Sequence, residues 1–301
     1  MPDDASVPGA GDVLVSVIIP VHGDRGGLRR TLEHLAAQRT RHTFEVVVAD
    51  NGDNGDVRAL AASVTGLDVR VVEEPQRGSY AARNTAVRAS EGSVLAFTDA
   101  DCLPRPTWLE SGLAVLEREG AGVFVGGGVD VVPARPARPG LAELWQIGHD
   151  LRQDVYLTRL HWSATANLFV RREDFDRVGP FDGSLESSGD KEWGQRARSR
   201  GVRAVHAPEA VIDHPARPTM KVLLAKRRRI VRGTLALSRS TGVPVYSTGA
   251  LRSLKPLLRD TWRESAQRAP RPLDRPRLLA VTALVHLYQR GYVARLKAQG
   301  L

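Results

Sequence analysis

Two carboxylates, Asp99 and Asp101, come directly after a short apolar run in this chain of 301 residues. The run, residues 94–98, has the composition of a buried strand, and one small residue, Ala100, separates the two acids. Carboxylate oxygens are the ligands that Mg²⁺ prefers, and Mn²⁺ takes them as well; such ions are often shared with substrate phosphates. The pair therefore predicts a site for Mg²⁺ or Mn²⁺ at the end of a strand. Because many surface turns contain the same pattern, the prediction needs support from the rest of the chain.

Polar clusters follow three other apolar runs. They are residues 22–24, residues 50–53, and Asp213 with His214 after a late apolar pair. In open α/β sheets, ligands bind at the carboxyl ends of the strands, and these ends face one edge. A single acid in such a place is more often a turn residue or a helix cap. Several acids that converge at one sheet edge indicate a ligand site instead.

An alternation of strands and helices must position these residues. The apolar pattern predicts buried strands at 13–21, 44–49, 67–72 and 94–98, and helices between them at 28–38, 57–64 and 79–89. This order is typical of a parallel sheet with right-handed crossovers. Farther along we expect helices at 108–119, 172–178 and 191–200, and strands at 123–132, 161–171 and 202–207. Residues 133–140 have the composition of an exposed loop, and helical patterning dominates from 218 onward.

Composition bounds the class of protein. The formal charge of +9 comes mostly from arginine and indicates either a compositional bias or attraction to anions. The aromatic residues are few and are not interleaved with the basic ones, which argues against a nucleic-acid platform. The single cysteine, Cys102, excludes an internal disulfide and a cysteine-based zinc site; we expect a small buried residue, with a reactive thiol as the alternative.

The domain organisation follows from the same patterns. We expect a disordered leader at 1–12, one α/β domain at 13–217 and a helical region at 218–301. The chain has no signal-peptide pattern and no apolar stretch of about 18 residues, so a cytoplasmic location is expected. In the last region, the basic residues 226–229 lie in an amphipathic helical pattern that suits an anionic membrane surface, such as the inner membrane face. A solvated face or a homodimer contact is the alternative.

Five segments in order resemble family 2 glycosyltransferases with the GT-A fold. They are the first strand at 15–21, the second strand with its acid at 46–52, the Gly-Ser-Tyr-Ala-Ala-Arg-Asn segment at 78–84, Thr98-Asp99-Ala100-Asp101, and the Gly-Asp-Lys-Glu-Trp segment at 189–193. The resemblance spans about residues 13–215. It implies a Rossmann-like, mostly parallel sheet flanked by helices, with a helical C-terminal extension. It also implies a nucleotide-sugar donor and a divalent cation, Mg²⁺ or Mn²⁺.

The resemblance also implies roles for single residues. Asp50 would accept from the uracil N–H, unless it is only a turn cap. Asp101 would bind the cation directly, Asp99 would contact the ribose or a metal-bound water, and His214, or less strongly His206, would lie near the metal or the diphosphate. The other nucleotide contacts expected are Pro20, Val21, His22, Arg77, Gly78, Arg83, Asn84 and Ala100. For Arg83, a solvated helix face is the alternative.

Asp190 is the expected general base. A carboxylate that takes the proton of the acceptor hydroxyl as the new bond forms lowers the barrier to transfer with inversion. The family has a Glu-Asp pair here, whereas this chain has Gly189 before Asp190, which leaves Glu192 as the second candidate. Both acids would otherwise only begin a helix, where negative charge is favourable. Trp193 and Trp162 are the expected acceptor contacts, and packing is the alternative for Trp193.

These residues together predict an inverting, metal-dependent glycosyltransferase. Its expected donor is a UDP-sugar, and its expected acceptor is a hydroxyl on a glycan, a lipid-linked molecule or a natural product. No nucleic-acid partner is expected. The alternatives are a sugar-phosphate nucleotidyltransferase and a module that binds a nucleotide sugar or a membrane surface without turnover. The first alternative leaves the late helix with Asp190 unexplained, and the second predicts binding without catalysis.

Overall fold

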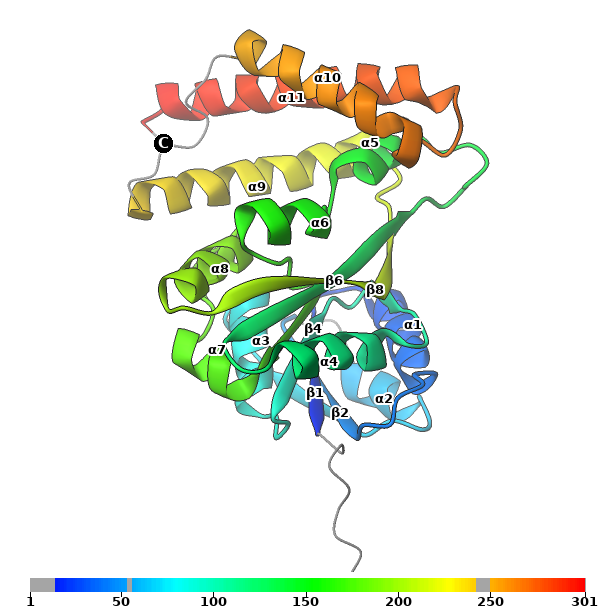
Figure 1. Cartoon of the computed structure of the whole chain (residues 1–301), viewed down its shortest axis with the longest axis vertical. Coiled ribbons are helices and arrows are strands. Elements are labelled where there is room, and N and C mark those ends of the chain that lie inside the picture. Colours follow the sequence, from blue (N-terminus) through cyan, green and yellow to red (C-terminus); the bar gives the residue numbers. More distant parts are fainter. Residues whose placement is uncertain (1–13, 53–55, 242–249, 301) are drawn as a thin grey trace, which may run out of the picture. The chain divides into compact units, whose positions relative to one another are not determined.

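A computed structural model gives the fold and describes residues 14–52, 56–241 and 250–300. The expected leader and Asp53 of the second polar cluster lie outside the described residues. The chain divides into two compact units. The first comprises residues 1–129, 153–184 and 189–212, and the second comprises residues 130–152, 185–188 and 213–301. Figure 1 shows the chain, with elements labelled where there is room.

The first third of the chain alternates strands and helices as expected. In order, these elements are β1 (Val15–Val21), α1 (Arg25–Ala36), β2 (Phe44–Asp50), α2 (Val57–Ala62), β3 (Val69–Glu73), α3 (Ser79–Arg88) and β4 (Val94–Thr98). Strand β1 pairs in parallel with β2 and with β4, and β2 pairs in parallel with β3. Strands β1, β2 and β4 are almost entirely buried, which explains their continuous runs of Val, Ile, Leu and Ala.

The rest of the first unit completes the sheet. Its elements are β5 (Leu103–Pro104), α4 (Trp108–Glu119), β6 (Val123–Val132), α6 (Gln153–Val155), a π-helical turn η1 (Tyr156–Leu160), β7 (Asn167–Arg171), α7 (Arg172–Val178), α8 (Gly189–Ser199) and β8 (Arg203–Pro215). The eight strands follow the order β3-β2-β1-β4-β7-β6-β8-β5. Strand β7 runs antiparallel to both β4 and β6. The mixed α/β fold is therefore confirmed, and the sheet changes from parallel to antiparallel pairing beyond β4.

Two boundaries differ from the expectation. The strand expected at 161–171 begins only at Asn167, because residues 156–160 form η1 and the segment between them is a turn. Asn167 fixes the start of β7: it is fully buried, and its side-chain amide donates to the carbonyl oxygens of Gly128 and Ala210 at 2.8 Å. The strand expected at 202–207 continues to Pro215. Helix α5 (Leu141–His149) was not expected.

The second unit is helical. It contains α5, α9 (Met220–Thr241), α10 (Ala250–Arg268) and α11 (Asp274–Ala298). One core cluster joins α5, α9 and α11 through Ala142, Trp145, Leu223, Leu278, Val281 and Val285. A second joins α9 and α11 through Val231, Leu235, Val293 and Leu296. The helical patterning expected from residue 218 onward is thus confirmed for the described residues.

The basic segment 226–229 is only partly exposed: its first two residues are half-buried and its last two are exposed. The Lys226 ammonium donates to the buried Asp150 at 2.6 Å. Burial opposes ionisation of Asp150, but the Lys226 ammonium outweighs it and lowers the Asp150 pKa to about 2. Arg227 lies over the Trp145 ring, 4.9 Å from its centroid. Part of this basic run therefore holds the helices together. No helix in the described ranges is long and apolar enough to cross a membrane.

Candidate active site

The parallel strands bring the predicted acids to one edge of the sheet. Asp50 ends β2 and pairs in register with Val21, the last residue of β1. Asp99 directly follows β4, whose residue Phe97 pairs with Ile18 of β1. Because β1 lies between β2 and β4, both acids leave the sheet at the end where β1 also ends. The expected convergence of strand ends is therefore present in the first unit.

The loop with the two acids is anchored by α1. Thr31 of α1 is buried, and its hydroxyl lies 2.9 Å from the carbonyl oxygen of Ala100 and 2.7 Å from that of Cys102. Asp99 and Asp101 are half-buried, whereas Ala100 and Cys102 between and after them are buried. The backbone thus turns the two carboxylates outward while the small residues face the core. Thr31 carries no motif, so the sequence did not indicate it.

Arg83 of α3 forms an ion pair with Asp99. Its side chain is 4% exposed, so the alternative of a solvated helix face is wrong. The buried Nε atom has no hydrogen-bond partner among the described residues. The buried guanidinium fixes the orientation of the half-buried carboxylate. Arg83 therefore positions the first acid of the pair.

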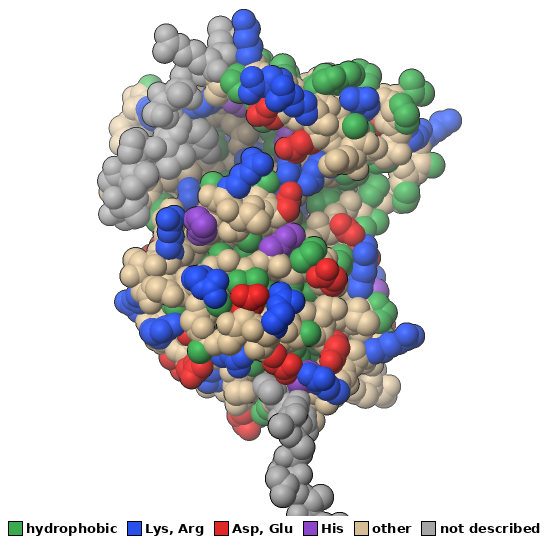
Figure 2. Space-filling model, viewed as in Figure 1, with side chains coloured by type: hydrophobic (Ala, Val, Ile, Leu, Met, Phe, Trp, Pro, Cys, Tyr) green, Lys and Arg blue, Asp and Glu red, His purple; other side chains and the backbone are tan. Residues whose placement is uncertain are grey.

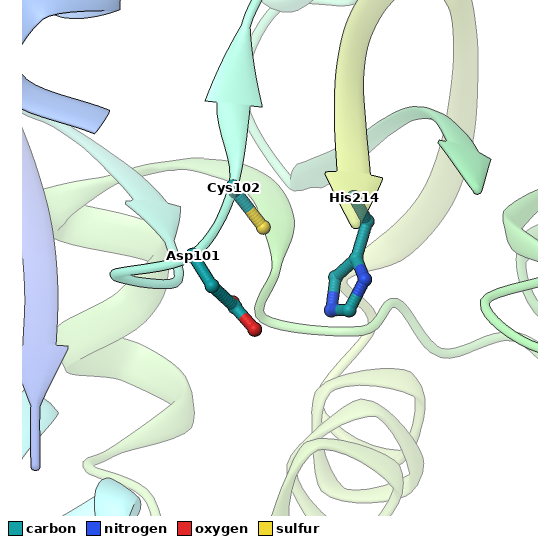
Figure 3. Close-up of side chains that lie close together, drawn as sticks. All are labelled: Asp101, Cys102 and His214. Atoms are coloured by element: carbon teal, nitrogen blue, oxygen red, sulfur yellow. The ribbon is translucent and has the colours of Figure 1, made fainter. Parts of the chain in front are cut away.

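A possible metal site lies at the second acid. Asp101 is followed by Cys102 in the loop after β4, and Figure 3 draws both side chains. Burial raises the pKa of the Cys102 thiol, which keeps it protonated and makes it a poor ligand. The expectation of a small buried residue at Cys102 is confirmed. The Asp101 carboxylate suits Mg²⁺ or Mn²⁺ better than a thiolate-seeking metal, and a ligand role for His214 stays a prediction.

The end of β2 is tied to the loop before α3 by Asn51. Its side-chain amide donates to the carbonyl oxygens of Glu74 and Gln76 at 2.7 Å and accepts from the Gly78 backbone N–H at 2.8 Å. Gly78 has φ of +133°, a conformation that favours glycine. The sequence singled out Gly78 but not Asn51, whose side chain shapes this loop.

The other expected nucleotide contacts lie close to these strand ends in the chain. Pro20 is half-buried, Val21 is buried, and His22 and Arg77 are exposed. Asp50 accepts from the Gly52 backbone N–H at 3.2 Å, as a turn cap does, so that alternative stays open beside the uracil contact.

Two other polar side chains that the sequence singled out, Asp24 and Asn84, are already engaged within the protein. Asp24 caps α1 by accepting from the Gly27 N–H at 2.7 Å, which is the helix-cap alternative. Asn84 uses both ends of its amide on the backbone of Phe181, at 2.7 and 3.0 Å, so a nucleotide contact for it stays a prediction. His206 is half-buried on β8, and a place for it near the metal or the diphosphate stays a prediction.

Asp190 begins α8 and meets α3 through Tyr80. The Tyr80 hydroxyl donates to Asp190 Oδ1 at 3.2 Å, and the Lys191 backbone N–H donates to the same oxygen at 2.9 Å. Burial raises the pKa of Asp190, and these hydrogen bonds and the charge of Arg83 oppose the shift. The Arg83 guanidinium also lies 5.7 Å from the centroid of the Tyr80 ring. A chain of contacts therefore links Asp99 to Asp190 through α3.

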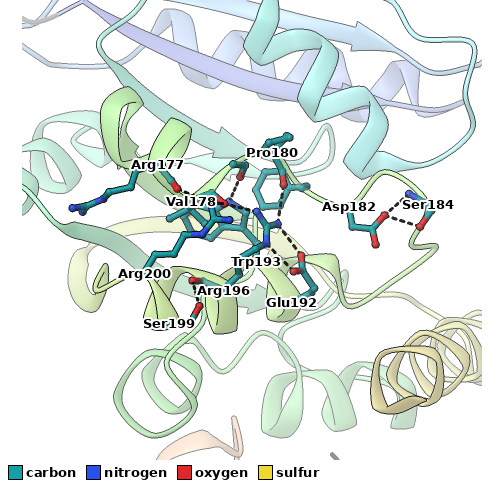
Figure 4. A network of polar contacts seen from close by, with 12 residues as sticks. Arg177, Val178, Pro180, Asp182, Ser184, Glu192, Trp193, Arg196, Ser199 and Arg200 are labelled. Atoms are coloured by element: carbon teal, nitrogen blue, oxygen red, sulfur yellow. Dashed lines mark hydrogen bonds and ion pairs between the residues drawn. The ribbon is translucent and has the colours of Figure 1, made fainter. Parts of the chain in front are cut away.

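Glu192 and Trp193, two and three residues after Asp190 in α8, belong to a structural network (Figure 4). Arg196 donates to both carboxylate oxygens of Glu192, at 2.8 and 2.9 Å, and also to the Val178 and Pro180 carbonyl oxygens. These bonds tie α8 to the end of α7. Glu192 is thus occupied as an anchor, which leaves Asp190 as the better candidate for a base.

The acceptor-platform role expected for Trp193 is wrong. Its side chain is 1% exposed, its Nε1–H donates to the Gly179 carbonyl oxygen at 2.9 Å, and its ring packs between aromatic side chains. Packing, the alternative, is what the structure shows. Trp162 is different, because it is half-buried and stacks on Tyr156 with ring centroids 4.0 Å apart. An acceptor contact for Trp162 stays a prediction.

Comparison with known proteins agrees with this arrangement. The chain is 35% identical over 227 residues to glycosyltransferase AglE of Haloferax volcanii, an alignment that covers 73% of each chain. It is 31% identical over 231 residues to validoxylamine A glucosyltransferase of Streptomyces hygroscopicus, which covers 66% of this chain and 51% of that protein. The chain thus spans about half the length of the second relative.

Solved structures share the fold. The mannosyltransferase PcManGT of Pyrobaculum calidifontis, solved with GDP-mannose and Mn²⁺, matches with a TM-score of 0.56 and 20% identity, over 99% of this chain and 77% of that one. TarS residues 1–349 of S. aureus, solved with UDP, matches with a TM-score of 0.54 and 18% identity, over 95% and 92%. Both are glycosyltransferases with the GT-A fold. The sequence model for Glycosyl transferase family 2 matches residues 16–179, and the chain belongs to that family.

Proposed function

We propose that the chain transfers a sugar, with inversion, from a nucleoside diphosphate sugar to an acceptor hydroxyl, with UDP as the nucleotide. The observation that carries the proposal is the linked pair of carboxylates at the sheet edge. Asp99 is held by the buried Arg83, and Asp190 is held by Tyr80 with a raised pKa. Asp99 would contact the ribose or a water bound to the cation, and Asp190, whose pKa burial raises, would accept a proton.

The donor would lie across the ends of β1, β2 and β4. Asp50 would accept the N3–H of uracil, which an adenine ring lacks at the corresponding position. Arg83 would orient Asp99 toward the ribose or the water around a cation. Asp101 would supply a carboxylate oxygen and His214 an imidazole nitrogen, which are ligands that fit Mg²⁺ or Mn²⁺. A divalent cation held there would stabilise negative charge on the departing diphosphate.

Asp190 would act as the general base. It would accept the proton of the acceptor hydroxyl while the hydroxyl oxygen attacks the anomeric carbon on the face opposite the leaving nucleotide. Its raised pKa makes it a stronger base than an exposed aspartate. A cytoplasmic location, the identity of the acceptor and a homodimer stay predictions.

Nucleotide binding is tested by the melting temperature with UDP or GDP, each with and without Mn²⁺. We expect metal-dependent stabilisation by UDP, of about 2.7 kcal/mol at a hundredfold excess over its dissociation constant. A response to GDP alone would change the proposed donor. No response to either nucleotide would contradict the proposal.

Catalysis is tested by Asp190→Asn. This change keeps an oxygen that can accept from Tyr80 but removes the basic carboxylate, so we expect transfer to fall by about 10²- to 10⁴-fold with UDP binding unchanged. Asp182→Asn is the matched control, because Asp182 lies exposed in the loop before α8 and caps a turn at Ser184. Full activity in Asp190→Asn would show that the base is another group. Nucleotide binding by the wild type without any turnover would favour a binding module.

A further inference from the structure

Helix α11 carries an apolar stripe on its exposed side. Between Arg277 and Arg290 the sequence contains no Asp, Glu, Lys or Arg. One side of this stretch is buried in the core of the second unit. On the other side, spacings of four, three and four residues align the exposed Ala280, Leu284, Leu287 and Gly291 into the outer stripe. Leu284 is 54% exposed and Leu287 is 45% exposed. The stripe runs for about 17 Å along the helix.

An apolar outer side is unusual for a helix at a protein surface, where the side opposite the core is normally polar. A helix that is apolar all round is normally covered on all sides by protein or lipid. Two more exposed apolar side chains lie where α10 leads into α11: Leu273, 78% exposed, and Trp262, 46% exposed. Arg275 joins them, since its guanidinium lies 4.2 Å from the centroid of the Trp262 ring.

The net charge of residues 218–301 indicates which kind of surface covers the outer stripe. Residues 218–301 contain 18 Lys and Arg against three Asp and Glu, a net charge of +15, whereas residues 1–217 carry −6. Among the described residues of this region, the acidic side chains that are exposed are already paired: Asp260 pairs with Arg259, and Glu264, whose side chain is 42% exposed, pairs with Arg152 and Arg268. Exposed basic side chains that have no acidic partner among the described residues include Lys221, Arg229, Lys255, Arg263, Arg295 and Lys297. Figure 2 shows Lys and Arg side chains among hydrophobic ones over these helices.

We infer that the outer stripe of α11 docks the protein on an anionic lipid bilayer. A bilayer with anionic headgroups has an apolar layer that would bury Leu284 and Leu287. It also has negative charge that would attract the basic side chains of residues 218–301. Trp262 suits the headgroup level, where an aromatic ring with one polar end is favoured. A second copy of the chain fits less well, because it would bring another region of +15 to the same surface. The inference does not depend on the proposed chemistry, and α11 lies outside the residues that the family model matches.

Sedimentation of the full-length protein with vesicles tests the inference. We expect binding to vesicles of phosphatidylglycerol and phosphatidylcholine, and little binding to phosphatidylcholine alone. Leu284→Glu with Leu287→Glu should weaken binding at least about tenfold, or about 1.4 kcal/mol. Leu160→Glu is the matched control, because Leu160 is 51% exposed but lies in η1 of the first unit. It should bind vesicles as the wild type does.

Three results would overturn the inference. The first is no binding of the wild type to phosphatidylglycerol vesicles. The second is equal vesicle binding by the double variant and the wild type, because binding would then depend on charge alone and not on the outer stripe. The third is a wild-type dimer that the double variant converts to a monomer without any binding to vesicles, because the outer stripe would then be a subunit interface. Circular dichroism of the double variant checks that it is folded. Since both residues are exposed, we expect an unchanged spectrum. If the spectrum changes, the variant Leu284→Ser with Leu287→Ser takes the place of the glutamate variant.

Discussion

Removing the Tyr80 hydroxyl should move the pH dependence of catalysis. Tyr80 is buried and packs on Phe181, with ring centroids 5.8 Å apart, so Tyr80→Phe keeps the ring and its packing. The change removes one hydrogen bond, the one donated to Asp190 Oδ1 at 3.2 Å. That bond favours the ionised carboxylate, as does the charge of Arg83, whereas burial and the negative charge of Asp99 favour the protonated form. Without the hydroxyl, the pKa of Asp190 should rise further.

The size of the shift follows from the geometry. Hydrogen bonds to charged groups contribute about 1.5–3 kcal/mol. The 3.2 Å separation is long for a bond from a hydroxyl to a carboxylate, so the lower value, about 1.5 kcal/mol, applies. Since one pKa unit corresponds to about 1.4 kcal/mol, the pKa of Asp190 should rise by about one unit.

The sign follows from the role of the base. Asp190 accepts a proton only when it is ionised, so activity falls as the pH drops through its pKa. The acid limb is the low-pH part of the plot of kcat/KM against pH, where activity falls as the pH drops. In Tyr80→Phe this limb should lie about one pH unit higher, and activity at pH values well above it should be nearly unchanged. Tyr288→Phe is the matched control, because it removes a hydroxyl that bonds to Arg228 on the C-terminal helices and should leave the limb in place.

Two results would refute the reasoning. An acid limb that does not move in Tyr80→Phe would mean that Asp190 does not control it. An equal loss of activity at every pH would mean that the hydroxyl acts in some other way, such as by holding α3 in place.

Three more substitutions test the structural assignments. Lys226→Met leaves the Asp150 carboxylate buried without its partner and should lower the free energy of unfolding by about 3–5 kcal/mol in urea titrations, whereas a loss near zero would contradict the buried pair. Trp193→Ala should cost about 3–5 kcal/mol of stability by the same measurement; a stable variant with only a raised acceptor KM would restore the platform role. Glu192→Gln breaks the ion pair to Arg196 and should leave kcat within a few-fold of the wild type, so a loss as large as that of Asp190→Asn would make Glu192 the base.

Local patterns in the sequence determined the first half of the fold. In the sequence, buried parallel strands appear as continuous apolar runs, and helices appear as apolar residues at spacings of three and four. The bounds of β1 to β4 and of the helices between them were therefore predicted to within a few residues. The antiparallel direction of β7 was not predicted, because strand direction depends on pairing between distant segments and has no signal in the local sequence. The late strand β7 also starts where a fully buried Asn167 satisfies carbonyl groups of other strands.

The candidate site divides in the same way. The sequence by itself determined which acids exist and that Asp50, Asp99 and Asp101 end strands, because strand ends and acid spacing are local properties. Only the tertiary structure decided their partners: Arg83 faces Asp99, and Tyr80 reaches Asp190 across 110 positions of the chain. Packing also decided that Trp193 is core and that Lys226 pairs with Asp150. Burial and contact arise from segments that fold together, so residue type and spacing alone do not specify them.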